Sequence, residues 1–353
     1  MNGASAPLPP LSEAILRELA SAPEAQGMSL PRLGKRLGQG VSVLLRQLTL
    51  MGDAAIGGVP GPGWVRVEQA GDRWVAHLTA TGRARLRPQA GARAAEVLAL
   101  REDGATVVND WLAEEVPVAL VFNGISHAVM MATPADLEDF ALGFSLTEGL
   151  LADPGELRGV DIVEASGGIE VRLEVSSACE WRLKERRRNL AGRTGCGLCG
   201  TDSLAMVRQT LPLLPEVPVA AASIAAAVAA LRTHQALQQL TGATHAAALC
   251  RLDDGAIESL REDVGRHNAL DKLIGAAVRE GRDRPRHFIA ITSRASFEMV
   301  QKAALAGVPA LAAISAPTAM AVALAQQCGL LLVGLVRPDG MSAYTFAQRL
   351  LRA

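Results

Sequence analysis

Apolar residues in the first fifty positions recur at helical spacing and predict three short helices. The apolar positions between Leu11 and Leu19 fall on one helical face, and Ser12 is a candidate N-cap. Ser29 and Pro31 indicate the start of a second helix, because serine caps a first turn and proline fits inside it. A third helix is predicted over 41–51.

The pattern then changes to two β-rich runs, Trp64–Glu68 and Trp74–Leu78, whose spacing predicts a hairpin. Three helices followed by a hairpin resemble a winged helix-turn-helix domain, whose third helix enters the DNA major groove. Here the third helix carries Arg46 as its base-reaching cation and is otherwise largely apolar. Contact with DNA, contact with protein and a relic without a partner all stay open. Residues 87–92 are typical of a linker.

The second half of the chain alternates between short apolar strands and helices. Two β-rich runs flank Asp253-Asp254-Gly255 and predict a hairpin. The next elements are expected to be a helix, then strand, helix, strand, helix and strand: Asn268–Arg279, His287–Thr292, Phe297–Ala306, Ala310–Ser315, Ala319–Cys328 and Leu330–Val336. That order predicts parallel strands joined by right-handed crossovers.

Ligands of such sheets bind beyond the carboxyl ends of the strands, opposite helix N-termini. One turn at that edge contains Ser293 and Arg294, and a second contains Ser315 and Thr318. These groups would suit an anionic ligand, although Ser315 and Thr318 are equally consistent with helix capping. His267 lies in a polar turn before a helix. Three roles are open for it: an acid–base group, a ligand contact or a capping partner.

Composition and charge indicate which broad class of protein the chain belongs to. The chain has 353 residues, 49% of them hydrophobic and 20% charged, which is a globular balance with length for two domains. Residues 1–95 carry 11 Lys and Arg against 6 Asp and Glu, whereas the remainder carries 24 against 30. No secretory signal is evident, and five scattered cysteines favour a reducing compartment. The uncharged run 303–336 is broken by proline and polar residues, which favours a buried core over a membrane span.

The segment GRTGCGLCG, residues 192–200, matches both G-x-G-x-x-G and C-x-x-C. A dinucleotide-binding turn directly follows a strand, but the preceding stretch, Glu180–Leu190, is too rich in arginine to be a buried strand. A structural zinc site needs four ligands, and the sequence has no second C-x-x-C and no H-x-E. No metal site is therefore predicted, and a redox dithiol lacks its usual strand–helix setting.

Nucleophilic sulfur is the remaining interpretation of this loop. Its glycines leave the thiols of Cys196 and Cys199 sterically accessible. Arginines lie just upstream and a helix N-cap signal, Thr201-Asp202-Ser203, lies just downstream, and both features lower a thiol pKa. The loop is therefore predicted to hold a reactive thiolate.

Several long motifs resemble the formate dehydrogenase accessory sulfurtransferases, the FdhD family. They are GRTGCGLCG, EDVGRHNALDKLIG, TSRASFEMVQKAALAGVP and SAPTAMAVALAQQCGLLLVGLVR, preceded by a similar N-terminal part, EEVPVALVFNGISHAVMMATPADLEDFALGFSLTEGL. The motifs occur in the order of the family and cover roughly residues 100–350. The resemblance leaves out the winged-helix-like segment, which is expected to be a fusion.

The resemblance implies an α/β fold with a cytidine-deaminase-like core, in which helices flank a mixed sheet. Together with the N-terminal pattern it predicts a winged-helix domain at 1–88, a linker at 89–98 and a sulfurtransferase domain at 99–353. It implies a cytoplasmic carrier that accepts persulfide sulfur from a cysteine desulfurase. The sulfur would pass to the molybdenum (or tungsten) bis-guanine-dinucleotide cofactor needed by formate dehydrogenase. A homodimer without membrane contact is expected.

By this resemblance the persulfide falls on Cys196, with Cys199 assisting. The family's cofactor-binding segment maps to Leu335, Val336, Arg337, Pro338, Asp339 and Gly340. Many members have a second basic residue there, which this chain lacks. Ser293, Arg294 and His267 are the other expected cofactor contacts.

Two alternatives stay open. One is a DNA-binding regulator that senses the molybdenum cofactor or redox state through the same cysteines. The other is a nicotinamide oxidoreductase, which the absence of a strand before the glycines argues against.

Overall fold

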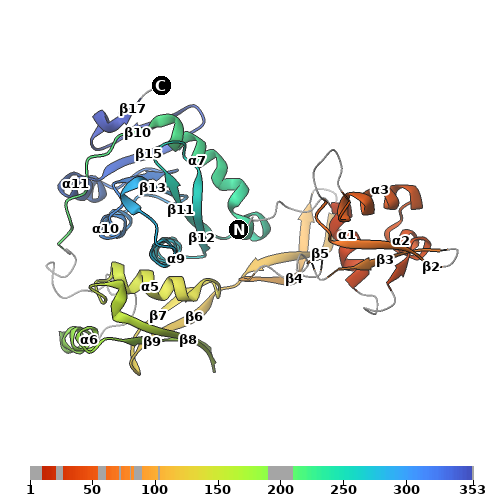
Figure 1. Ribbon diagram of the computed structural model, residues 1–353, viewed down its shortest axis with the longest axis horizontal. Coiled ribbons are helices and arrows are strands. Elements are labelled where there is room, and N and C mark those ends of the chain that lie inside the picture. The colour runs from red at the N-terminus through yellow and green to blue at the C-terminus, as the bar shows by residue number, and fades with distance from the viewer. Residues whose placement is uncertain are drawn as a thin grey trace. The chain divides into compact units, whose positions relative to one another are not determined.

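The computed structural model describes residues 10–20, 27–54, 61–70, 73–79, 81–82, 90–101, 104–189 and 210–351. The chain divides into two compact units, one of residues 5–89 and the other of residues 90–353 together with 1–4. Figure 1 shows the helices and strands of each unit. Each unit has its own hydrophobic core.

The smaller unit contains three helices and a hairpin, as the sequence pattern predicts. Its elements are α1 (Pro10–Ala20), β1 (Met28–Ser29), α2 (Leu30–Leu37), α3 (Val41–Met51), β2 (Val65–Ala70) and β3 (Arg73–Leu78). The three strands form a sheet in the order β1-β3-β2. Ser29 stands at the N-cap of α2, as expected, but Ser12 does not cap α1. Ser12 lies inside α1 and is buried there, and its hydroxyl accepts a hydrogen bond from Gln47 Nε2 of α3 at 2.7 Å.

The larger unit begins with a two-stranded antiparallel ribbon, β4 (Ala92–Arg101) and β5 (Gly104–Ala113). Its ten paired positions run from Ala92 opposite Ala113 to Arg101 opposite Gly104. Most of the linker expected at 89–98 is therefore strand. The sequence did not reveal this because neither face of the ribbon is fully buried: Leu98 is 62% exposed on one face and Val108 is 36% exposed on the other.

Four strands and two helices follow the ribbon. They are β6 (Val116–Phe122), β7 (Ile125–Ala132), α5 (Leu137–Thr147), β8 (Leu157–Ala165), β9 (Gly168–Val175) and α6 (Ser177–Asn189), with a 3-10 turn at Pro154–Glu156. The sheet order is β7-β6-β9-β8, with β6 and β9 parallel. Apolar side chains of this sheet share one core with Phe140 and Phe144 of α5 and with Cys179 and Leu183 of α6.

A six-stranded mixed sheet forms the centre of the unit, in the order β12-β11-β13-β14-β15-β16. Its strands are β11 (His245–Arg251), β12 (Ile257–Asp263), β13 (His287–Ile291), β14 (Ala310–Ala313), β15 (Leu331–Arg337) and β16 (Gly340–Ala343). As predicted, β11 and β12 form a hairpin, and β13, β14 and β15 are parallel.

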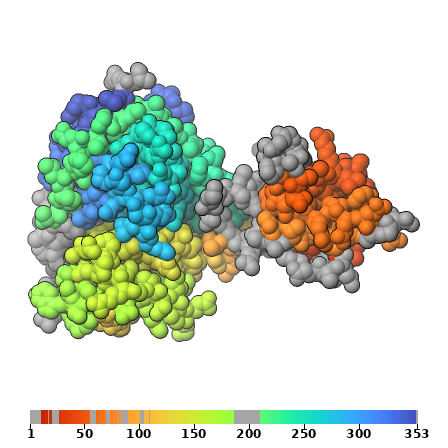
Figure 2. All heavy atoms as spheres, viewed as in Figure 1, coloured from red at the N-terminus to blue at the C-terminus, as the bar shows by residue number. Residues whose placement is uncertain are grey.

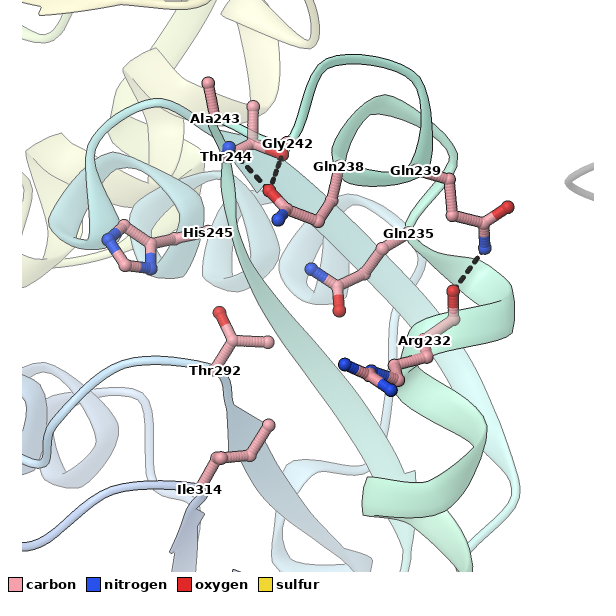
Figure 3. A pocket seen from close by; sticks show the side chains of 10 residues that line it. All are labelled: Arg232, Gln235, Gln238, Gln239, Gly242, Ala243, Thr244, His245, Thr292 and Ile314. Atoms are coloured by element: carbon pink, nitrogen blue, oxygen red, sulfur yellow. Dashed lines mark hydrogen bonds between the residues drawn. The ribbon is translucent and has the colours of Figure 1, made fainter. Parts of the chain in front are cut away.

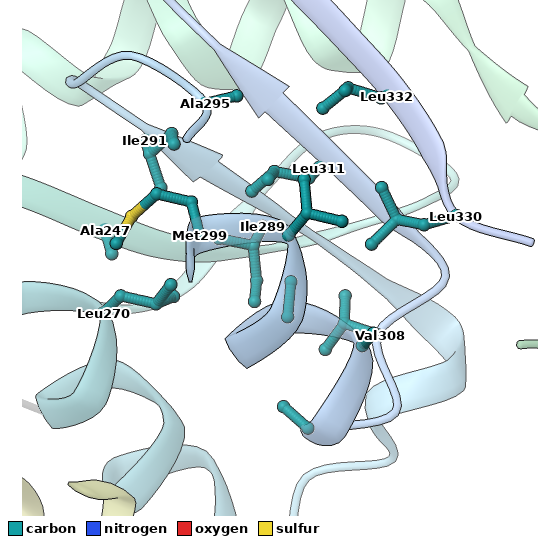
Figure 4. Packing of buried hydrophobic residues seen from close by; sticks show 14 of the residues in the cluster. Ala247, Leu270, Ile289, Ile291, Ala295, Met299, Val308, Leu311, Leu330 and Leu332 are labelled. Atoms are coloured by element: carbon teal, nitrogen blue, oxygen red, sulfur yellow. The ribbon is translucent and has the colours of Figure 1, made fainter. Parts of the chain in front are cut away.

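Helices cover both faces of this sheet, so the unit is a mixed α/β structure. The helices are α7 (Ala221–His234), α8 (Ala236–Thr241), α9 (Arg266–Arg279), α10 (Phe297–Leu305) and α11 (Ala319–Cys328). Side chains of α9, α10 and α11 pack with one set of alternating strand residues, including Ile289 and Leu311 (Figure 4). Ile224 and Leu231 of α7 pack with the opposite set, which includes Phe288. Short β10 (Val219–Ala220) and β17 (Leu350–Leu351) pair in parallel, and 3-10 turns lie at Arg284–Arg286 and Ala347–Arg349.

The two sheets of the larger unit are joined where α5 packs closely against α9. A methyl group at Gly143 would lie 1.8 Å from the carbonyl oxygen of Asp271, and one at Gly275 would lie 1.9 Å from that of Asp139. Glycine at both positions is what lets the helices touch. Figure 2 accordingly shows a continuous surface from the yellow residues of the first sheet to the green and blue residues of the second.

Buried charges cross the same junction. Lys302 of α10 binds Asp271 of α9 at 3.0 Å and also donates to Thr147 Oγ1 of α5 at 2.9 Å. Lys272 and Asp263, both fully buried, pair at 2.6 Å, and the Asp263 carboxylate accepts from the backbone N–H of Thr133 at 3.0 Å. Each buried ion thus has a counter-ion and hydrogen bonds, which offsets its desolvation.

The long uncharged run 303–336 lies largely in the interior. It contains β14, α11 and most of β15, and the first of these strands is fully buried. Within the residues that the structure describes, no helix has both the length and the apolar character needed to cross a bilayer.

Candidate functional site

A hollow of about 760 Å³ lies at the carboxyl-end edge of the parallel strands. Thr292 follows β13 and Ile314 follows β14, while His245 starts the antiparallel β11 at the same edge. Figure 3 shows Thr292 and Ile314 pointing into the hollow from one side, and Arg232 and Gln235 from the other. The remaining lining residues are Gln238, Gln239, Gly242, Ala243 and Thr244. The volume falls within the range of small-molecule sites.

Glu262 holds the glutamine-bearing helix α8 in position. Its carboxylate accepts hydrogen bonds from the backbone N–H groups of Leu237 at 2.9 Å and Gln238 at 2.8 Å, at the start of α8. It also accepts from Thr244 Oγ1 at 3.0 Å. Burial raises the pKa of Glu262, although these three hydrogen bonds oppose the shift. The carboxylate therefore serves as a buried cap that fixes one wall of the hollow.

His245 contributes a neutral imidazole to the wall. Burial lowers its pKa, and the nearby positive charges of Arg266 and His267 lower it further. Beside it, Thr292 Oγ1 accepts a hydrogen bond from the backbone N–H of Ala246 at 2.9 Å, which fixes the threonine at the end of β13. The hollow thus offers uncharged donors and acceptors, with Arg232 as its one lining cation among the described residues.

The predicted cofactor segment borders this hollow. The Arg337 guanidinium donates a hydrogen bond to the backbone carbonyl of Ile314, a lining residue, at 2.6 Å. Leu335 has a left-handed φ of 54° and is 41% exposed, whereas the Val336 side chain is buried in the core. Residues 335–337 of this segment belong to β15, and Gly340 begins β16. Pro338 and Asp339 form the exposed turn between them.

The other predicted contacts are more dispersed. Ser293 is buried and its hydroxyl donates to the carbonyl of Arg294 at 3.1 Å, while the Arg294 side chain is exposed. Neither residue lines the hollow, although the adjacent Thr292 does. Thr318 is a helix cap, because its hydroxyl accepts from the N–H of Ala321 at 3.2 Å.

His267 lies in the first turn of α9 and pairs with Glu298 of α10. The contact with His267 lowers the pKa of Glu298, which keeps the carboxylate ionised. His267 does not cap α9, whose N-cap position is Gly265. It is close enough to His245 to influence its pKa, and so lies near the hollow without lining it.

The two motif cysteines, Cys196 and Cys199, fall outside the described residues, as do the glycines around them. Their flanks are described. On the N-terminal side α6 packs into the first core through Cys179 and Leu183. On the C-terminal side the N–H of Leu214 donates to the carbonyl of Cys328, at the end of α11, at 2.9 Å. The segment between these flanks therefore connects α6 to the α11 side of the six-stranded sheet.

The three other cysteines are buried. Cys179 and Cys250 are fully buried, and Cys328 is 3% exposed. Burial raises the pKa of the Cys250 thiol to about 12 and also raises that of Cys328. Thiols in such surroundings stay protonated and are poor nucleophiles. Across the described ranges no cluster of His, Cys, Asp and Glu is arranged to hold a metal ion.

Sequence reasoning missed the α7–α8 side of the hollow. Arg232, Gln235, Gln238 and Gln239 match no known motif. The one feature of the sequence that could have indicated this wall is the spacing of the three glutamines. Gln235, Gln238 and Gln239 are three and four residues apart, which places polar amides on one side of a helical segment. Their position opposite Thr292 depends on tertiary packing.

Comparison with known proteins shows which protein family the chain resembles. A sequence model described as the FdhD/NarQ family matches residues 113–351. A protein of Variovorax paradoxus named "Sulfur carrier protein FdhD" is 54% identical over 270 residues, 76% of this chain and 94% of that protein. A Bordetella petrii protein of the same name is 52% identical over 248 residues, 70% of this chain and 89% of that one.

The fold has a counterpart among solved structures. The crystal structure of a Desulfotalea psychrophila protein, provisionally assigned as a formate dehydrogenase accessory protein, superposes with a TM-score of 0.59 at 23% identity. The match covers 74% of this chain and 99% of that one. The family match covers the larger unit from the end of β5 almost to the C-terminus. This chain therefore belongs to the FdhD/NarQ family.

Proposed function

We propose that the chain is a sulfur carrier that accepts a persulfide on Cys196 from a cysteine desulfurase. The Cys196 thiolate attacks the outer sulfur of the donor persulfide and forms a new sulfur–sulfur bond with it. The donor's own sulfur–sulfur bond breaks, and the donor cysteine leaves as a thiolate. The step is an exchange without net oxidation or reduction. Cys199 assists from three residues away.

The observation that carries this proposal is the burial of every cysteine outside the motif. Cys179, Cys250 and Cys328 are at most 3% exposed, and none can receive sulfur from another protein without unfolding. The accepting role therefore falls on the C-x-x-C motif. The names of the relatives, which describe them as sulfur carriers, support the same reaction class.

The acceptor is proposed to be the molybdenum bis-guanine-dinucleotide cofactor, before its insertion into formate dehydrogenase. The hollow between α8 and β13 suits one of its guanine nucleotides. Gln235 and Gln238 provide amides for the edge of a base, and Arg232 provides a cation for a phosphate. Arg337 lies at its border through Ile314. The solved relative, by its assignment a formate dehydrogenase accessory protein, supports this destination.

We infer that the smaller unit is a winged helix and that the core of the larger unit is cytidine-deaminase-like. The order α1-β1-α2-α3-β2-β3 with one small antiparallel sheet supports the first inference. The solvent side of α3 argues against the DNA-binding alternative. Val41, Val43 and Leu50 are 41–48% exposed there, beside the exposed polar residues Ser42, Arg46 and Thr49, whereas a base-reading helix carries mainly polar side chains on that side.

The proposal is tested in a host that lacks its own carrier. Formate dehydrogenase activity is measured after complementation with the unmodified chain, with Cys196→Ala and with Cys250→Ala. The unmodified chain and Cys250→Ala should restore activity, and Cys196→Ala should not. Equal restoration by all three chains would remove Cys196 from the reaction.

A further inference from the structure

Helices α9 and α10 begin beside each other at the carboxyl-end edge of the six-stranded sheet. His267, in the first turn of α9, pairs with Glu298, in the first turn of α10, and the two side chains are 29% and 23% exposed. Among the described residues no side chain caps either helix, because the N-cap of α9 is Gly265 and Ser296, the N-cap of α10, makes no cap hydrogen bond. Helix N-termini carry free N–H groups and a partial positive charge. Two such ends meet here within reach of solvent.

Arg266, the first residue of α9, is a partly buried cation without a counter-ion. No carboxylate in the described part of the chain forms an ion pair with it, and its Nε is buried without a hydrogen-bond acceptor. Glu298, the acidic residue of these two first turns, contacts His267 instead. A buried donor without an acceptor costs free energy, so such a group in a native protein calls for a partner such as an ion or a water molecule. The Arg266 guanidinium is thus available to an anion.

The hydroxyl of Ser296 is also unused. Its Oγ is buried and has no hydrogen-bond partner within the residues that the structure describes. A serine or threonine at an N-cap usually accepts from a backbone N–H of its own helix. Thr318 at the start of α11 does so, accepting from the N–H of Ala321 at 3.2 Å. Ser296 therefore keeps a free hydroxyl at the same pair of helix ends as Arg266.

The turn that carries Arg266 is held rigidly. The Asp263 carboxylate accepts a hydrogen bond from the N–H of Gly265 at 2.8 Å and one from Asn268 Nδ2 at 3.0 Å. Lys272 balances the charge of this carboxylate, which is fully buried. These bonds fix the start of α9 before any ligand binds, so that little conformational entropy is lost on binding.

These helix ends border the hollow. His245 lines the hollow and is the strand partner of Asp263, three residues before Arg266. Burial lowers the pKa of His245, and the positive charge of Arg266 lowers it further, which agrees with this proximity. Figure 3 shows His245 and Arg232 on opposite sides of Thr292. Arg266 therefore adds a cation at the end of the hollow away from Arg232.

We infer that the paired N-termini of α9 and α10 form an oxyanion site, in which Arg266 and Ser296 donate hydrogen bonds to a phosphate group. Phosphate suits these donors, because a guanidinium binds it through charge-assisted hydrogen bonds and helix N-termini favour its charge. The phosphate belongs either to a nucleotide in the hollow or to free inorganic phosphate, and the chemistry of the site is the same for both. The inference goes beyond sulfur transfer, because no cysteine takes part in it.

Isothermal titration calorimetry of the full-length chain with inorganic phosphate, at constant ionic strength, tests the site. The unmodified chain should bind phosphate, and Arg266→Met should weaken the affinity by about ten- to hundredfold, because a charge-assisted contact is lost. Ser296→Ala removes a hydroxyl but no charge and should weaken it less, by about two- to tenfold. Arg286→Met is the matched control. Arg286 is exposed just before β13, at the opposite edge of the sheet, and its replacement should leave the affinity unchanged.

Thermal unfolding without phosphate separates a ligand-binding role from a structural one. Arg266→Met and Ser296→Ala each remove a buried polar atom that has no partner in the described chain, so neither should lower the Tm of the phosphate-free protein. An arginine that served only to hold α9 in place would lower the Tm when replaced. Phosphate should raise the Tm of the unmodified chain, because it binds the folded state, and should raise that of Arg266→Met much less.

Competition with GDP identifies the source of the phosphate. If saturating phosphate weakens GDP binding and Arg266→Met weakens it too, the occupant is the phosphate of a nucleotide in the hollow. If phosphate and GDP bind independently, the occupant is free phosphate, and both results support the site. Absence of phosphate binding to the unmodified chain, or equal affinity of Arg266→Met, overturns it. No sulfur donor is present in these measurements, so the sulfur-carrier proposal is tested separately.

Discussion

The guanidinium of Arg337 donates a hydrogen bond to the backbone carbonyl of Ile314 at 2.6 Å, which joins the end of β15 to the turn after β14. Ile314 lines the hollow at the carboxyl-end edge of the sheet, so this bond brings a cation to its border. The Arg337 side chain remains exposed and can turn toward an anion. The relationship links a residue predicted from a family resemblance to a site found from the structure.

If the hollow binds a guanine nucleotide, GDP should bind to the chain measurably and Arg337→Ala should weaken that binding. Loss of a charge-assisted contact costs about 1.5–3 kcal/mol, or roughly one to two decades in Kd. Isothermal titration calorimetry measures the change. Arg251→Ala is a matched control, because Arg251 is exposed and paired with Asp253 at the opposite end of β11. Equal affinities of the unmodified chain and Arg337→Ala would exclude Arg337 from the site.

The buried ion pair of Lys302 and Asp271, which lies at the junction of the two sheets, should contribute strongly to the free energy of unfolding. Lys302→Met leaves the Asp271 carboxylate buried without its counter-ion and should lower the free energy of unfolding by about 3–5 kcal/mol. The double variant Asp271→Leu with Lys302→Met should recover part of that loss, because it removes both buried charges. Urea denaturation followed by circular dichroism measures these changes.

The matched control is an exposed pair. Arg172→Met disrupts the contact of Arg172 with Glu170, and its effect should stay within about 1 kcal/mol. A loss of this small size for Lys302→Met would show that the buried pair does not hold the two sheets together.

The smaller unit should be dispensable for sulfur transfer, since the motifs of the family match lie beyond it. A truncated chain should begin at Ala90, because β4 starts at Ala92 and the N–H of Glu114 donates to the carbonyl of Gly91 at 2.6 Å. This chain should restore formate dehydrogenase activity to the level of the full chain. A folded truncated chain that fails to do so would assign the smaller unit to the core function.

Much of the fold could be predicted from the sequence wherever burial produces a clear pattern of apolar residues. Helix α3 spans 41–51 as predicted. The alternation of β13, α10, β14, α11 and β15 was visible because the strands are short, continuous apolar runs that are buried on both faces, separated by longer helical segments. The β4–β5 ribbon was missed because it has no buried face. Ser12 was misassigned because its partner, Gln47, lies 35 residues away.

The candidate site was predictable only in part, for a similar reason. The strand ends at Thr292 and Ile314 follow from the rule that ligands bind beyond the carboxyl ends of parallel strands. The opposite wall comes from α7 and α8, and its place is set by Glu262 of β12, whose contacts with the start of α8 cross 24 and 25 residues of sequence. Long-range hydrogen bonds of this kind leave no periodic signal in the sequence.

The buried cysteines should resist modification in the native state. Because burial raises the pKa of Cys250 to about 12, its thiol stays protonated at pH 8 and becomes a thiolate only as the pH approaches 12. Iodoacetamide at pH 8 should therefore label Cys196 and Cys199 and spare Cys179, Cys250 and Cys328. Peptide mapping by mass spectrometry identifies the labelled sites, with the urea-unfolded chain, in which all five should react, as the reference. Rapid labelling of Cys250 in the native chain would show that the β11 core opens readily.

The central claim is that Cys196 accepts the sulfur, and intact mass after incubation with a cysteine desulfurase and cysteine tests it most directly. The unmodified chain and Cys250→Ala should gain the mass of one sulfur atom, and Cys199→Ala should gain it at least in part. Cys196→Ala should gain none, because no exposed thiol in the accepting position remains. Sulfur on Cys196→Ala but not on Cys199→Ala would show that the wrong cysteine has been assigned. Normal loading of both variants would contradict the account, because the motif would then not be the carrier.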